Sequence, residues 1–109
     1  MSALEIDCRT VKQRLDDKAD FLLLDCREST EYATARIEGS VLIPMSEITD
    51  RVQDLEAWRS KPIVVHCHHG GRSLRVTLWL RSQGFTDVLN LTGGIDEWSQ
   101  QIDSTVPRY

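Results

Sequence analysis

Short runs of apolar residues alternate along this chain with segments in which apolar residues recur every three or four positions. A continuous apolar run is typical of a strand buried on both faces, whereas the wider spacing is typical of a helix with one buried face. The expected strands are 4–7, 21–24, 41–43, 63–66 and 88–91, and the expected helices are 10–18, 29–32, 46–55, 73–83 and 95–100. This alternation predicts an α/β fold with a mainly parallel central sheet and helices on both faces.

Local signals mark the ends of the helix expected over 73–83. Ser73 is a good N-cap residue because its hydroxyl can accept a bond from the first turn. Gly84 stands where a glycine often ends a helix in the left-handed conformation. Leu74 and Leu78 lie four positions apart, so they share one face of this helix.

Length and charge exclude several classes of protein. The chain has 109 residues, so we expect residues 1–109 to form a single domain. Its 13 basic and 17 acidic residues give a net charge of −4, which argues against nucleic acid as a partner. No apolar run approaches the roughly 20 residues that cross a bilayer, so we expect no membrane partner. The N-terminus lacks the basic start and apolar stretch of a signal peptide, which predicts a cytoplasmic location.

The cysteines point to reactive chemistry. An odd number of them, Cys8, Cys26 and Cys67, cannot all pair, so we expect free thiols. Cys67 follows the expected strand 63–66, and Asp25 follows the expected strand 21–24. Ligands of parallel α/β sheets gather at the carboxyl ends of the strands. Cys67 and Asp25 are therefore expected to share that edge.

The segment after Cys67 has the composition of an anion-binding loop. Gly70 and Gly71 allow positive φ and a close approach of the backbone to a ligand. Successive N–H groups in such a turn can converge on an anion, and the following helix adds the positive end of its dipole. Arg72 adds a permanent cation, and Ser73 can donate to the loop. Together these features predict a lowered pKa for Cys67 and a stabilised anion on its sulfur.

The size of this loop distinguishes two reactions. Cysteine-dependent phosphatases have five residues between the cysteine and the arginine, and the loop holds three phosphoryl oxygens. Here only His68, His69, Gly70 and Gly71 separate Cys67 from Arg72. The tighter loop favours a single sulfur atom over a tetrahedral phosphoryl group.

At this point the chain resembles the rhodanese-like sulfurtransferases, specifically their short single-domain forms. The stretch 67–73 resembles their Cys-x-x-Gly-x-Arg-Ser pattern. Segments 23–28, 31–44 and 84–98 resemble three further stretches of the family, in the same order. The resemblance therefore covers nearly the whole chain and implies the three-layer rhodanese fold.

The resemblance also implies a reaction. Cys67 would take sulfane sulfur from a small donor such as thiosulfate, and a thiol or cyanide acceptor would remove it from the resulting persulfide. Cys67 and Arg72 are the implied catalytic residues, and the implied substrate-binding residues are His68, His69, Gly70, Gly71 and Ser73. No metal or organic cofactor is implied. The resemblance also implies a sulfur-relay protein as a further partner.

Several residues have other interpretations. Asp25 and Arg27 are expected to support the loop as a structural ion pair rather than to act in catalysis. Cys26 stands where the family commonly has valine, and core packing is the favoured interpretation. It could resolve a persulfide or form a disulfide with Cys67 if their Cα atoms lay within about 7 Å. The histidines around Cys67 do not have the spacing of tetrahedral zinc sites, so no metal is expected.

Two departures bear on specificity. The family's Gly-His-Ile appears here as residues 35–37, Ala-Arg-Ile. His68 and His69 also make the mouth of the loop less firmly cationic than lysine would, which weakens the case for thiosulfate as the donor.

Two alternative functions remain. The first is a noncatalytic rhodanese-like binding or regulatory module, although such modules usually lack the cysteine. The second is a cysteine-dependent phosphatase or arsenate reductase, against which the loop size argues.

Overall fold

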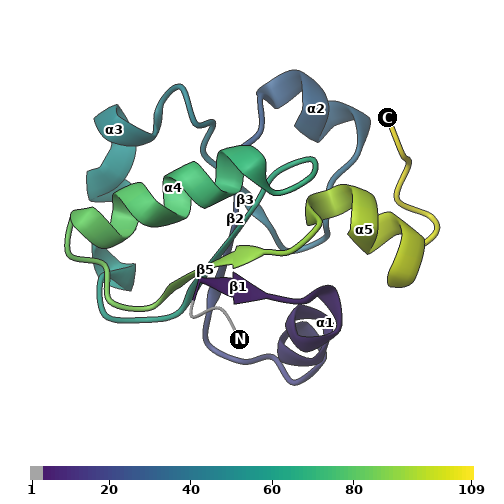
Figure 1. Ribbon diagram of the computed structural model, residues 1–109, viewed down its shortest axis with the longest axis horizontal. Coiled ribbons are helices and arrows are strands. Elements are labelled where there is room, and N and C mark those ends of the chain that lie inside the picture. Colours follow the sequence, from purple (N-terminus) through teal and green to yellow (C-terminus); the bar gives the residue numbers. More distant parts are fainter. Residues whose placement is uncertain (1–3) are drawn as a thin grey trace.

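The computed structural model describes residues 4–109, in which strands and helices alternate along the chain (Figure 1). The strands are β1 (Glu5–Ile6), β2 (Leu22–Asp25), β3 (Val41–Leu42), β4 (Ile63–His66) and β5 (Val88–Leu91). The helices are α1 (Cys8–Asp16), α2 (Ser29–Thr34), α3 (Ile48–Arg51), the 3-10 helix η1 (Val52–Trp58), α4 (Gly71–Ser82) and α5 (Gly94–Gln101). The expectation about a signal peptide rests partly on residues 1–3, which lie outside the described residues.

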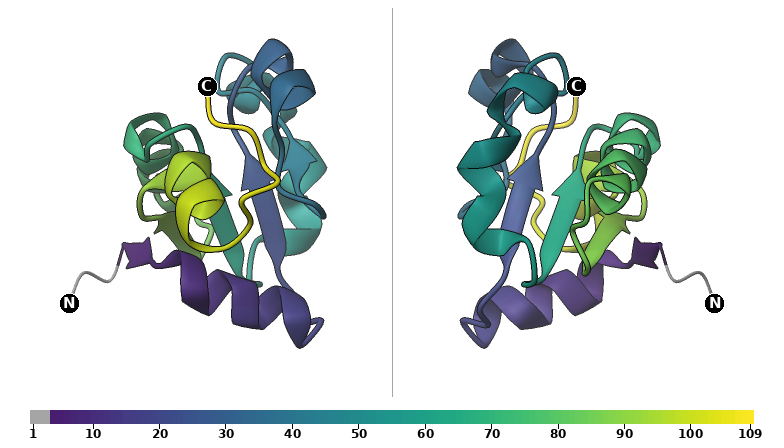
Figure 2. Two further views of the ribbon diagram at one scale, coloured as in Figure 1. Left: turned by 90° about the vertical axis from the view of Figure 1, so that its right-hand side faces the viewer. Right: turned by 90° about the vertical axis from the view of Figure 1, so that its left-hand side faces the viewer.

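The described strands form one parallel sheet in the order β1-β5-β4-β2-β3. Every residue of β2 and β4 is buried, which explains their unbroken apolar runs. The arrows of β2 and β4 point to the same edge of the sheet, near α2 (Figure 2). We call it the carboxyl edge. The predicted α/β fold with a parallel central sheet is confirmed.

Helices cover the sheet on both faces because strand residues alternate between two apolar clusters. The first cluster joins Leu24 and Val65 of the sheet to helical residues such as Leu80 of α4 and Leu55 of η1. The second cluster contains the neighbouring strand residues Leu23 and Val64, whose side chains point to the other face of the sheet. It also contains residues of α1 and α5. The sheet therefore separates two layers of helices, with α4 on one face and α5 on the other.

The expected helix over 46–55 differs in the structure. An α-helix covers only Ile48–Arg51, and the chain continues as the 3-10 helix η1. Val52, Leu55 and Trp58 lie three residues apart, and all three pack against the first cluster. A 3-10 helix has three residues per turn, so this geometry places the three side chains on one face.

Helix α4 begins earlier than expected. Gly70 is its N-cap residue, and Ser73 lies inside the first turn, so the prediction of Ser73 as the N-cap is wrong. Leu78 is 47% exposed, whereas Val76 and Leu80 are buried against the sheet. The Leu74–Leu78 pair therefore does not define the packed face of α4. Gly84 follows the end of the helix with a φ of +93°, as expected.

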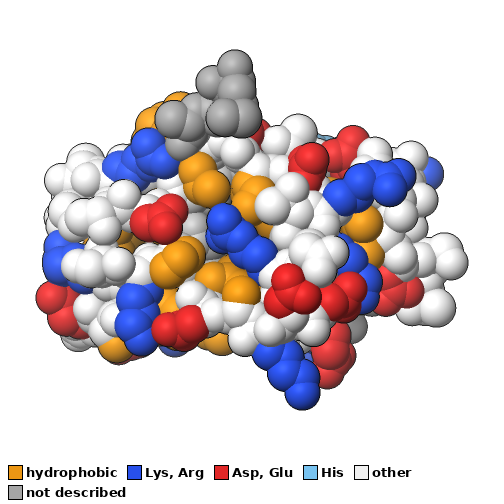
Figure 3. Space-filling view, turned by 90° about the horizontal axis from the view of Figure 1, so that it is seen from below, with side chains coloured by type: hydrophobic (Ala, Val, Ile, Leu, Met, Phe, Trp, Pro, Cys, Tyr) orange, Lys and Arg blue, Asp and Glu red, His pale blue; other side chains and the backbone are white. Residues whose placement is uncertain are grey.

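Acidic and basic side chains alternate over the face that contains α1, and neither sign dominates there (Figure 3). Within residues 4–109, no helix combines the length and the apolar character needed to cross a membrane.

Candidate active site

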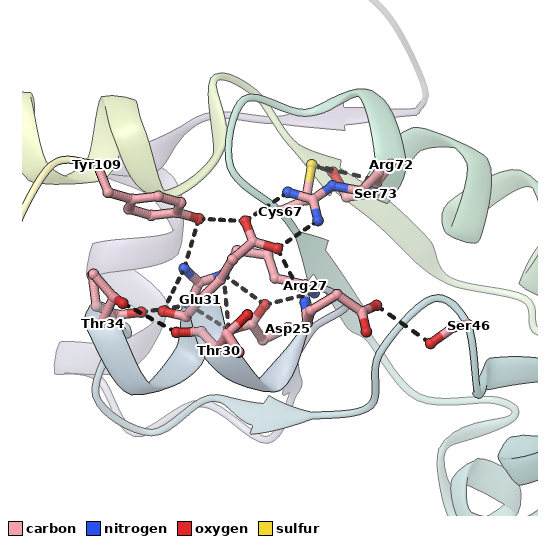
Figure 4. A network of polar contacts seen from close by, with 12 residues as sticks. Asp25, Arg27, Thr30, Glu31, Thr34, Ser46, Cys67, Arg72, Ser73 and Tyr109 are labelled. Atoms are coloured by element: carbon pink, nitrogen blue, oxygen red, sulfur yellow. Dashed lines mark hydrogen bonds and ion pairs between the residues drawn. The ribbon is translucent and has the colours of Figure 1, made fainter.

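The loop that follows β4 curls around the sulfur of Cys67, whose side chain is buried. The backbone N–H of Gly70 donates to Sγ at 3.1 Å, and the N–H of Ser73 donates to it at 3.4 Å. The Ser73 hydroxyl lies 3.3 Å from the same sulfur and also contacts the side-chain oxygen of Asn90. The close-up in Figure 4 shows Ser73 directed at Cys67. We call residues 67–73 the cysteine loop.

The two glycines of the cysteine loop play different parts. Gly70 has a φ of +118°, a conformation that L side chains rarely adopt, and its N–H reaches the sulfur from there. Gly71 has no positive φ, and a Cβ built on it would meet nothing within 4 Å. Of the two glycines, which both allow positive φ, only Gly70 adopts it.

A third glycine, Gly94 at the start of α5, lies against the cysteine loop. The sequence interpretation did not single it out as a site residue. A Cβ on Gly94 would lie 2.5 Å from the carbonyl oxygen of Cys67. This close approach lets Ile95 N–H donate to the Cys67 carbonyl at 2.9 Å and Asp96 N–H donate to the His68 carbonyl at 3.1 Å. The first turn of α5 therefore holds the cysteine loop in place through these two hydrogen bonds. In the sequence, only the Gly93-Gly94 pair could have indicated this contact.

Hydrogen bonds lower the pKa of Cys67 to about 4, although burial opposes this shift. The largest contribution comes from the thiol of Cys26, followed by the hydroxyl of Ser73 and then by the N–H groups of Ser73 and Gly70. The predicted lowering agrees in direction with the structure. The contribution of Cys26 was not foreseen.

The side chain of Arg72 reaches Glu31 of α2. Its guanidinium donates to the two carboxylate oxygens of Glu31 at 2.7 and 2.9 Å (Figure 4). This contact lowers the pKa of Glu31 to about 2 and raises the pKa of Arg72. The ion pair ties the cysteine loop to α2 across the carboxyl edge. Sequence reasoning gave Glu31 no role, and a catalytic role for Arg72 stays a prediction.

Asp25 and Arg27 form a fully buried ion pair at the end of β2. Arg27 donates to Asp25 through Nη2 at 2.7 Å and through Nε at 3.0 Å, and also to the carbonyl of Ala35 at 2.6 Å. These bonds satisfy the guanidinium in a site without solvent. The structure thus contains the ion pair that the sequence suggested, at the same edge as Cys67. His66 Nε2 lies 3.9 Å from this Asp25 carboxylate. Burial lowers the pKa of His66.

Tyr109 contacts both the cysteine loop and α2. Its ring stacks on His68 with 4.0 Å between centroids and 9° between planes. Its hydroxyl donates to Glu31 at 2.8 Å and accepts from Arg27 at 2.8 Å (Figure 4). The sequence of the last residues gave no indication of this contact.

The loop histidines differ in exposure. His68 is half-buried, and its pKa is lowered, first by burial and then by His69. His69 is exposed, with Nδ1 3.9 Å from a carboxylate oxygen of Asp96. Both histidines belong to the cysteine loop, and a role in binding substrate stays a prediction. Among residues 4–109, no three His, Cys, Asp or Glu side chains are grouped as metal ligands.

Residues 7–101 match the family described as Rhodanese-like domain. The chain belongs to this family. A protein named Sulfurtransferase from Allochromatium vinosum is 36% identical over 96 residues, which is 88% of either chain. Thiosulfate sulfurtransferase GlpE from Pseudomonas fluorescens is 37% identical over 79 residues, covering 71% of this chain and 69% of that protein.

A longer relative contains a similar segment. Adenylyltransferase and sulfurtransferase MOCS3-1 from Zea mays is 34% identical, with 95% of this chain matched to only 23% of that protein. Among solved structures, a rhodanese-related protein from Thermoplasma volcanium has a TM-score of 0.80 at 28% identity, covering 91% of this chain and 93% of that one. The predicted rhodanese fold is therefore confirmed.

Proposed function

We propose that this protein is a sulfurtransferase that carries sulfane sulfur as a persulfide on Cys67. The observation that carries the proposal is the ring of donors around the sulfur. Two backbone N–H groups and a hydroxyl approach a thiol whose pKa they lower. A thiolate is the nucleophilic form of cysteine, so these contacts favour attack on sulfur at neutral pH.

In the first step the Cys67 thiolate attacks the outer sulfur of a donor such as thiosulfate. A bond forms between the two sulfurs, the S–S bond of thiosulfate breaks, and sulfite leaves with the bonding pair. The product is Cys67–S–S⁻. The N–H groups of the first turn of α4 have no carbonyl partner inside the helix, and those beside the sulfur are suited to hold this anion.

In the second step a nucleophile attacks the outer sulfur. Cyanide leaves as thiocyanate, or a thiolate leaves as a persulfide, and Cys67 is released as the thiolate that began the cycle. The same donors stabilise the sulfur anion before and after each step, so they need not reorganise during the reaction. Family membership and the relatives named sulfurtransferase support this type of chemistry.

The size of the cysteine loop supports sulfur rather than phosphorus as the atom attacked. Only four residues separate Cys67 from Arg72, and Gly70 N–H already lies 3.1 Å from the sulfur. Arg72 is also engaged by both oxygens of Glu31, whereas a phosphatase arginine must be available to a phosphoryl group. Thiosulfate and a thiol or cyanide remain the proposed donor and acceptors, and the cytoplasm remains the predicted location.

Intact-mass measurement after incubation with thiosulfate tests the proposal. We expect the wild type to gain one sulfur atom, and to lose it again when cyanide is added. Cys67→Ser should gain none, and Cys8→Ala should behave as the wild type, because Cys8 lies in the opposite apolar cluster. Absence of the adduct with thiosulfate and with a glutathione persulfide donor would overturn the proposal. Hydrolysis of an aryl phosphate that is lost in Cys67→Ser would favour the phosphatase alternative.

A further inference from the structure

Cys26 and Cys67 are the residues that directly follow two neighbouring parallel strands, β2 and β4. Asp25 of β2 pairs with His66 of β4, and the next N–H, that of Cys26, donates to the His66 carbonyl at 3.1 Å. Neighbouring strands lie about 4.8 Å apart. This separation falls within the range of about 4.4 to 6.8 Å between Cα atoms that a disulfide spans.

The two side chains also lie on the same face of the sheet. Both belong to the first apolar cluster, and both are buried. Each thiol is also the largest influence on the pKa of the other, which agrees with two neighbouring sulfurs. Gly70 and Ser73 donate to the sulfur from the cysteine loop instead. Cys26 therefore lies in the same apolar cluster as Cys67, and the loop donors come from residues 70 and 73.

Cys26 stays protonated while Cys67 is a thiolate. Its hydrogen bond to Cys67 is the main reason that its pKa is raised, and burial adds to the effect. Once the Cys67 sulfur is bonded to a second atom and is no longer an anion, this main cause disappears. Cys26 can then give up its proton more readily, at the moment when its neighbour has become an electrophile.

We propose that Cys26 is the resolving thiol of Cys67, and that the pair forms a disulfide when a hydroperoxide oxidises Cys67. The Cys67 thiolate attacks one oxygen of hydrogen peroxide, the O–O bond breaks, and hydroxide leaves, which gives a sulfenic acid. The Cys26 sulfur then attacks the Cys67 sulfur. An S–S bond forms, the S–O bond breaks, and the hydroxyl leaves as water with the proton of Cys26.

The consequence is reversible inactivation in place of damage. A sulfenic acid with no thiol beside it reacts with more peroxide to give a sulfinic acid, which thiols do not reduce. The disulfide interrupts that route, and an external dithiol restores both cysteines by exchange. Only the thiolate of Cys67 is required, so the inference does not depend on sulfur transfer.

The inference is tested by treating the protein with hydrogen peroxide and identifying the products by mass spectrometry. We expect the wild type to lose two hydrogen atoms in intact mass and to retain one thiol that can be alkylated after unfolding, that of Cys8. Dithiothreitol should then restore all three thiols and the reactivity of Cys67. Digestion should yield one peptide pair, joined through Cys26 and Cys67.

Two variants serve as comparisons. Cys26→Val keeps the apolar volume, so we expect it to fold, and peroxide should add two or three oxygen atoms to it irreversibly. Cys26→Ser provides the same test if the valine variant is unstable. Cys8→Ala should form the disulfide as the wild type does. The ratio of disulfide to sulfinate is the readout, because loss of the Cys26 hydrogen bond also changes the rate of the first step.

Two outcomes would overturn the inference. One is a wild type that gains oxygen as readily as Cys26→Val, and the other is a disulfide that persists in Cys26→Val. If the disulfide forms as expected but thiosulfate adds no sulfur to Cys67, only the proposed function fails.

Discussion

The low pKa of Cys67 depends on single atoms around its sulfur. The groups that lower this pKa belong either to the backbone or to short side chains held by core packing. They are the N–H groups of Gly70 and Ser73, the Ser73 hydroxyl and the Cys26 thiol. Such donors stabilise the thiolate more than the thiol, because a hydrogen bond to an anion is roughly twice as strong as one to a neutral group. Removal of one donor should therefore raise the pKa of Cys67.

Replacement of Ser73 by alanine tests this expectation. Loss of the hydroxyl beside the sulfur should raise the pKa of Cys67 by about 1 unit, since a charge-assisted hydrogen bond contributes about 1.5 kcal/mol or more. The wild type should react with iodoacetamide at a constant rate from neutral pH down to about pH 5 and should lose reactivity as the pH falls through the low pKa. In Ser73→Ala this decline should begin at a higher pH.

Ser82→Ala is the matched control, because Ser82 lies at the other end of α4 and is exposed. Its pH profile should match that of the wild type. An unshifted profile for Ser73→Ala would show that the hydroxyl does not stabilise the thiolate.

At the scale of secondary-structure elements, the cysteine loop is held between two helices. The first turn of α5 donates to the carbonyls of Cys67 and His68, and α2 contributes Glu31, which binds Arg72. These contacts fix both ends of the loop, so its N–H groups stay directed at the sulfur. The approach of α5 is possible only because residue 94 has no side chain.

Substitution of Gly94 by alanine should disturb this arrangement. Its φ is +59°, and the added Cβ would meet the Cys67 carbonyl at 2.5 Å, so either α5 or the cysteine loop must move. We expect the free energy of unfolding, measured with urea, to fall by about 1 to 3 kcal/mol. The rate of Cys67 alkylation should fall as well.

Gly71→Ala is the control for this prediction. Its Cβ would point into open space from an ordinary helical conformation, and alanine is the better helix former by about 1 kcal/mol. We therefore expect unchanged or slightly increased stability. Equal losses in the two variants would contradict the difference that the structure draws between these glycines.

At the scale of the whole molecule, the Asp25–Arg27 pair connects segments that are distant in sequence. Arg27 joins the end of β2 to the Ala35 carbonyl beyond α2 and to Tyr109 at the C-terminus. A buried pair of this kind contributes little net stability, but each partner requires the other, because an unpaired buried charge costs several kcal/mol. The carboxyl edge of the sheet is therefore organised around one buried guanidinium.

Arg27→Met should destabilise the whole fold. We expect the free energy of unfolding to fall by about 3 to 5 kcal/mol, since Asp25 would remain buried without its partner. Arg36→Met, at an exposed position of the same region, should change it by less than about 0.5 kcal/mol. Equal stability of Arg27→Met and the wild type would show that Asp25 is neutral or solvated in the folded protein.

The sequence predicted the strands and helices better than it predicted which residues pack against one another. The strands at 63–66 and 88–91 match β4 and β5 in both bounds, because continuous apolar runs and flanking turn residues are local signals. The split of 46–55 into α3 and η1 was not predicted, since packing of Val52, Leu55 and Trp58 against the sheet decides it. The single-domain organisation of residues 1–109 stays a prediction.

The sequence by itself determined the parallel α/β architecture and the position of a cysteine with a lowered pKa at the end of a buried strand. These follow from periodicity and from the glycines, arginine and serine beside Cys67. Only the tertiary structure decided which groups complete the site: Cys26 against the sulfur, Gly94 under the cysteine loop, Glu31 on Arg72 and Tyr109 on His68. The reason is physical, because these contacts depend on strand register and helix packing, which bring together residues that the sequence keeps far apart.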